Sequence, residues 1–72
     1  MKTLLLLAKG VEMMEMSVFV DVFGWARSDF GMDTQITTCG FNKQVISTFN
    51  IPLTVDLTID EVNVDEYDAL AI

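Results

Sequence analysis

Two acidic residues at the start of a methionine-rich stretch are the first candidates for chemistry. Glu12 and Glu15 stand three positions apart in VEMMEM, directly after Lys9 and Gly10. This spacing brings both carboxyl groups to the first turn of a helix, where acids are favoured by about 0.3–1 kcal/mol through the helix dipole. An apolar environment would instead favour a neutral carboxyl group that transfers protons. From the residues alone, the helix-start interpretation is preferred for both acids.

Other reactive side chains are scarce. The sequence has one cysteine, Cys39, and no histidine, which excludes an internal disulfide, a Cys/His zinc cluster and a histidine-based catalytic pair within these residues. Cys39 ends an apolar segment and is interpreted as a small buried hydrophobic residue. Neither G-x-G-x-x-G nor a P-loop motif follows the first apolar run. We therefore expect no metal and no cofactor.

Composition limits the class of protein. The chain has 72 residues, 51% of them hydrophobic, and a net charge of -7, so it holds one domain or part of one. No Lys or Arg follows Lys43 and acids crowd the last third, a surface that repels phosphate backbones. The apolar run Leu4–Ala8 is too short for a signal peptide or a membrane span. We expect a cytoplasmic protein that binds neither nucleic acid nor membranes.

The first half of the sequence reads as a strand, a helix and a second strand. Thr3–Ala8 is a continuous apolar run typical of a parallel strand covered on both faces. A helix is predicted from about Glu12 to Ala26, with its stop after Arg27, and Thr34–Cys39 alternates as a strand. The helix has two apolar stripes, one of Glu15, Val18, Phe19 and Val22 and one of Met16, Val20 and Phe23. This order predicts a right-handed βαβ unit with parallel strands.

The second half is more broken. Gln44–Thr48 and Ile51–Val55 predict a β-hairpin arm, in which Pro52 favours an edge position. A short helix capped by Thr58 or Asp60 follows, and Asp68–Ile72 reads as another central strand. Such a sheet with one helix leaves much apolar surface uncovered. We therefore expect the remainder of the domain to be another chain or a missing segment.

The motif A-K-G-x-E-x-x-E, Ala8 to Glu15, joined to VDVFGWA and the strand YDALAI, resembles the N-terminal portion of the ThiJ/PfpI superfamily. This superfamily includes the parkinsonism-associated deglycase and bacterial stress proteins. The resemblance implies a flavodoxin-like, class I glutamine amidotransferase-like α/β fold, a three-layer sandwich. This chain would supply the first βαβ unit, a β-hairpin arm and the start of a further strand. Residues 1–72 are then the N-terminal part of a single domain, without the elbow that carries the nucleophilic cysteine.

The resemblance also implies roles for individual residues. Glu15 matches the conserved glutamate that exchanges protons beside the cysteine of a glyoxalase, deglycase or hydrolase acting on small carbonyl compounds. Gly10 is a turn residue, a substrate-binding residue, or both. Family members commonly form homodimers through this first helix, which makes Met14 a candidate interface residue, although Gly24 and Trp25 replace arginines that some dimeric members carry. The alternative is a non-catalytic member acting as a redox sensor, chaperone-like protein or ligand-sensing domain.

Overall fold

A leucine-rich strand lies in the middle of a four-stranded parallel sheet. The computed structural model describes residues 1–72. In it, β1 (Lys2–Leu6) pairs with β2 (Gln35–Gly40) on one side and β6 (Ala69–Ala71) on the other. The short β5 (Leu57–Thr58) adds to the outer edge of β2, giving the order β5-β2-β1-β6. Successive leucines of β1 point to opposite faces and both faces are covered there, so Leu4 and Leu5 are both buried.

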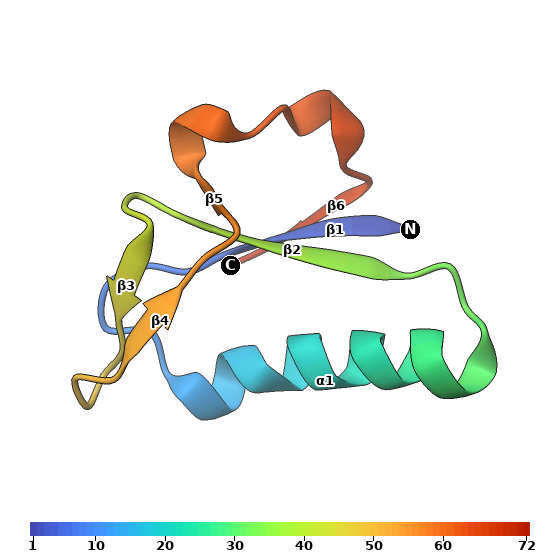
Figure 1. The fold of residues 1–72 in the computed structure, drawn as a ribbon, viewed down its shortest axis with the longest axis horizontal. Helices are drawn as coiled ribbons and strands as arrows, with labels where there is room; N and C mark the ends of the chain where they lie inside the picture. Colours follow the sequence, from blue (N-terminus) through green and yellow to red (C-terminus); the bar gives the residue numbers. More distant parts are fainter.

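The helix α1 (Met13–Phe30) connects β1 to β2 and covers one face of the sheet (Figure 1). It continues one turn beyond the predicted end, so the stop expected after Arg27 is wrong. Gly31 ends the helix by adopting the left-handed conformation, with φ 63°, and the N–H of Met32 bonds back to the Ala26 carbonyl over 3.2 Å. Ser28 and Asp29 form a polar last turn and do not break the helix. The helix is too short or too polar to cross a membrane.

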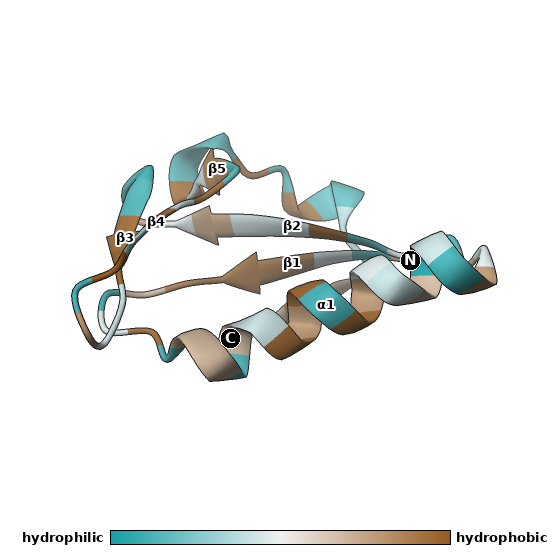
Figure 2. Cartoon of the chain, turned by 60° about the horizontal axis from the view of Figure 1, so that its bottom comes forward, coloured by the Kyte–Doolittle hydropathy of each residue, from teal (hydrophilic) through white to brown (hydrophobic).

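The two apolar stripes of α1 have different surroundings. On the stripe that faces the sheet, Met16 and Phe23 are half-buried, and Met16 packs against the core of Leu5, Leu7, Val45 and Val55. On the outward side, Val18 and Val22 remain 57% and 58% exposed. Figure 2 shows hydrophobic residues recurring along the length of α1. The stripe of Met16 and Phe23 therefore contacts the sheet, whereas Val18 and Val22 of the other stripe remain exposed.

A two-stranded arm extends from the carboxyl end of the sheet. Its strands β3 (Gln44–Ile46) and β4 (Pro52–Thr54) pair antiparallel, as the sequence predicts. Asn50 takes φ 66° in the connecting turn, and the Ser47 hydroxyl accepts a hydrogen bond from the Ile51 N–H. With only two strands, the arm tolerates Pro52, which lacks an N–H donor.

The connection from β5 to β6 lies on the face of the sheet opposite α1 (Figure 1). The single short helix predicted here is wrong, because two 3₁₀ turns form instead, η1 (Ile59–Glu61) and η2 (Val64–Glu66). Thr58 is the N-cap residue of η1, as expected, and both its N–H and its hydroxyl donate to the Glu61 carboxylate. The sequence did not predict β5, since two residues carry no pattern of their own. The strand arises from pairing with Cys39 and Gly40.

Candidate functional site

The loop between β1 and α1 is held in place by the hairpin arm. Gly10 adopts φ 86°, a conformation natural to glycine. Its N–H donates to the Ile46 carbonyl over 2.7 Å, and its carbonyl accepts the Thr48 hydroxyl, also over 2.7 Å. A bridge between Val11 and Ser47 continues the contact. The loop lies beyond the carboxyl end of a central parallel strand, where ligands of open α/β sheets collect.

Glu15 lies in the first turn of α1 and lines a small cavity. This cavity has a volume of about 70 Å³, and the other seven residues that line it are all hydrophobic: Leu5, Leu6, Leu7, Val11, Met16, Phe19 and Ile72. The Glu15 side chain lines this cavity and is exposed to solvent. One carboxyl group therefore lies at the edge of an apolar hollow, beside the strand end where a substrate is expected. This arrangement permits proton transfer to a molecule bound there.

Glu12 marks the start of helix α1 and does not line the cavity. It is the N-cap residue of α1, with φ -83° and ψ 116°, and its carbonyl accepts the N–H groups of Glu15 and Met16. Its side chain makes no capping bond. The two acids of the motif therefore differ in setting, since Glu12 begins the helix whereas Glu15 lines the cavity.

The structure places the two other predicted site residues without testing their roles. Both backbone polar groups of Gly10 are bonded within the chain, which accounts for its role in the turn, so substrate contact by Gly10 stays a prediction. Met14 projects from the outward side of α1 and is 79% exposed. Its place in a dimer interface likewise stays a prediction.

Cys39 is placed where solvent and reagents have little access to its thiol. It is fully buried in β2, between Leu6 of β1 and Leu57 of β5. Burial raises the pKa of its thiol above the ordinary value, so the reactive thiolate is disfavoured. The interpretation of Cys39 as a buried hydrophobic residue agrees with this placement.

Sequence reasoning missed two features beside the loop. One is the hydrogen bonding of Thr48, for which the sequence holds no signal because its partner is 38 positions away. The other is a hollow of about 250 Å³ that Lys9 and Asn42 line together with residues of β3. The lysine that directly follows the apolar run Leu4–Ala8 was the available signal for this hollow.

An open parallel sheet whose two central strands are connected by a helix defines an α/β protein. A model of the DJ-1/PfpI family matches residues 1–72, the whole chain. The chain belongs to the DJ-1/PfpI family, as the A-K-G-x-E-x-x-E resemblance indicates. No curated protein matches the sequence closely enough to extend this statement.

Solved structures show the same fold in longer chains. An AraC family transcriptional regulator from Pseudomonas putida superposes with a TM-score of 0.84 at 20% identity, covering 96% of this chain and 37% of that one. Schizosaccharomyces pombe DJ-1 gives 0.79 at 19% identity, covering 97% and 38%. A cysteine-to-alanine mutant of a DJ-1 superfamily protein from Salmonella typhimurium gives 0.59 at 30% identity, covering 83% and 30%. The flavodoxin-like α/β prediction is confirmed, and the chain spans less than two-fifths of each of these structures.

Proposed function

We propose that residues 1–72 are the N-terminal part of a single DJ-1/PfpI-like domain. This domain acts on small electrophilic carbonyl compounds through a cysteine that lies outside these residues. Glu15 serves as the acid/base group of the reaction. The observation that carries the proposal is the place of the Glu15 carboxyl group, at the edge of an apolar cavity beyond the carboxyl end of β1.

The chemistry follows from that environment. Leu5 and Phe19 line the cavity together with Glu15, so a carbonyl compound bound there would lie close to one proton-transferring group. In the proposed reaction, the Glu15 carboxyl group holds the cysteine thiolate by a hydrogen bond without taking part in its attack. When the thiolate adds to the carbonyl carbon, the carbonyl oxygen gains negative charge and takes the proton from Glu15. The carboxylate then serves as base in the following step.

The proposed enzyme works as a homodimer in the cytoplasm. The outward side of α1 carries exposed apolar residues along its length, among them Met14, Val18 and Trp25. A surface of this kind favours contact with another protein surface, and the second subunit is the proposed occupant. The free thiol of Cys39 suits a reducing compartment.

Replacement of Glu15 tests the catalytic role. In the intact protein, Glu15→Gln keeps the size of the side chain and removes its acid, and we expect turnover of methylglyoxal or a related carbonyl compound to fall by roughly 100-fold or more. Glu12→Gln is the matched control, because it changes an acid three residues away that does not line the cavity. If Glu15→Gln and the unaltered protein were equally active on every substrate tested, the catalytic role would be contradicted. Glu15 would then be only an acidic residue in the first turn of the helix. A non-catalytic sensor or chaperone-like protein would then be the better interpretation.

A further inference from the structure

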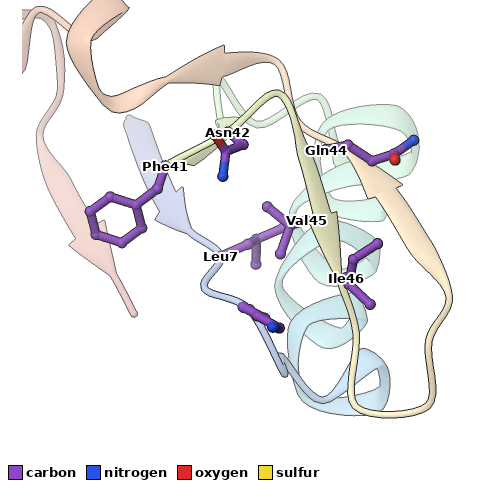
Figure 3. Close-up of a pocket in the computed structure, with 7 residues that line it drawn as sticks. Leu7, Phe41, Asn42, Gln44, Val45 and Ile46 are labelled. Carbon is purple, nitrogen blue, oxygen red and sulfur yellow. The ribbon is translucent and has the colours of Figure 1, made fainter.

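A second hollow shares Leu7 with the Glu15 cavity and is otherwise lined by different residues. It measures about 250 Å³ and is formed by the end of β1, the turn from β2 to β3, and β3 itself. Figure 3 shows the side chains of Leu7 and Val45 meeting in its middle, with Asn42 above them and Phe41 farther out. Ligand pockets usually have about 300 Å³ or more, so this hollow suits a small molecule.

The floor of the hollow is rigid. Leu7 and Val45 are only 2% and 5% exposed and belong to the main core. Gly40 lies under Val45 so closely that an added Cβ would come within 2.7 Å of the Val45 Cγ2 atom. Strand β3, which carries Val45, is held in place because the Ile46 carbonyl accepts the Gly10 N–H. An apolar ligand group therefore meets a preformed surface and pays little to organise it.

The rim of the hollow is polar and carries one positive charge. Lys9 and Asn42 both line it, and Lys9 is exposed. Two of the other basic side chains are engaged within the chain: Lys43 donates to the Asp56 carbonyl, and Lys2 lies 5.3 Å from the centre of the Tyr67 ring. In a chain of net charge -7, an ammonium group and an amide donor that line the same hollow favour a negative group there.

We propose that this hollow binds a small organic carboxylate. The carboxylate group contacts the Lys9 ammonium and the Asn42 amide, and the apolar part of the molecule lies on Leu7 and Val45. A phosphate group fits less well, since phosphate sites gather several backbone N–H donors. The Gly10 N–H, in the loop that follows Lys9, is already bonded to the Ile46 carbonyl. The site shares only Leu7 with the Glu15 cavity, and the proposal does not depend on the chemistry of Glu15.

A binding measurement on the intact protein tests this site. The probes are 4-methylpentanoate and its neutral twin 4-methylpentanamide, followed by NMR through the methyl signals of Val45, which lines this hollow and not the Glu15 cavity. We expect the carboxylate to shift these signals and to bind more tightly than the amide. Lys9→Met should weaken carboxylate binding roughly tenfold or more, as loss of a charged hydrogen bond predicts, and should leave amide binding unchanged.

Lys2→Met is the matched control, because it removes the same charge from the opposite end of β1 and should bind both probes as the unaltered protein does. Equal weakening by Lys2→Met would show that only overall charge matters and would overturn the proposal. So would equal binding of acid and amide, shifts confined to other residues, or displacement of the acid by lower concentrations of inorganic phosphate. Because the readout is binding and not turnover, a failure here is distinct from a failure of the Glu15 assay.

Discussion

The hydroxyl of Thr48 donates a 2.7 Å hydrogen bond to the carbonyl oxygen of Gly10, joining residues 38 positions apart. The Thr48 N–H adds a second bond of 3.0 Å to the Val11 carbonyl. Through these bonds the end of the hairpin arm holds the loop that leads into α1. Glu15 follows this loop directly, so its position depends on a contact with the arm.

Thr48→Val should loosen this loop. The substitution keeps the shape of the side chain and removes its hydroxyl, so we expect the free energy of unfolding to fall by about 0.5–1.5 kcal/mol. Hydrogen exchange at the Gly10 amide should accelerate, because the arm that bonds to it is held less firmly. Thr54→Val on β4 is the control. Urea denaturation measures the difference, and equal stability of the two variants would contradict the bracing role.

Gly10→Ala and Gly24→Ala should have opposite effects on stability. An added Cβ would meet no atom within 4 Å at either position, so only backbone conformation distinguishes them. Gly10 has φ 86°, and alanine there should cost about 1–2 kcal/mol. Gly24 is inside α1, where alanine should add about 0.5–1 kcal/mol. Thermal or urea denaturation reads both, and a stabilised Gly10→Ala variant would show that the loop conformation is wrong.

Cys39 should resist thiol reagents in the folded protein. It is fully buried and its pKa is raised by desolvation, so little thiolate exists at neutral pH and little reagent reaches it. We expect labelling by iodoacetamide at pH 7.5 to be slow without denaturant and rapid in urea. Mass spectrometry of peptides that contain Cys39 follows the reaction. Rapid labelling under native conditions would place this thiol at the surface.

The Thr58 cap predicts a dependence of stability on acid pH. The Thr58 hydroxyl lowers the pKa of Asp60, and the Thr58 N–H, followed by its hydroxyl, lowers the pKa of Glu61. A lowered folded-state pKa means that the unfolded chain binds protons more readily. The stabilisation is therefore present above the ordinary carboxyl pKa and is lost as the pH falls through the lowered values.

NMR titration of the Asp60 and Glu61 side-chain carboxyl carbons measures these pKa values directly. Thr58→Val removes the hydroxyl and keeps the N–H. We expect this variant to return the Asp60 pKa toward its ordinary value and to change that of Glu61 less. Ordinary values for both acids in the unaltered protein would contradict the cap.

Much of the βαβ unit could be predicted because its signals are local. The leucine run of β1 and the apolar stripes of α1 can each be recognised within one short segment. The A-K-G-x-E-x-x-E motif is likewise continuous in the sequence. The end of α1 was placed too early because Ser28 and Asp29 look like a loop. Their helical conformation is settled by Gly31, whose left-handed geometry supplies the true stop.

By itself, the sequence determined the central strand, the long helix, the parallel order and the family, since each rests on composition or spacing within one segment. Only the tertiary structure decided that Thr48 braces Gly10, that Leu57 and Thr58 form a strand, and that Lys9 shares a hollow with Asn42. These features join segments that are distant along the chain. The energy of such contacts depends on distance in space, which no local pattern records.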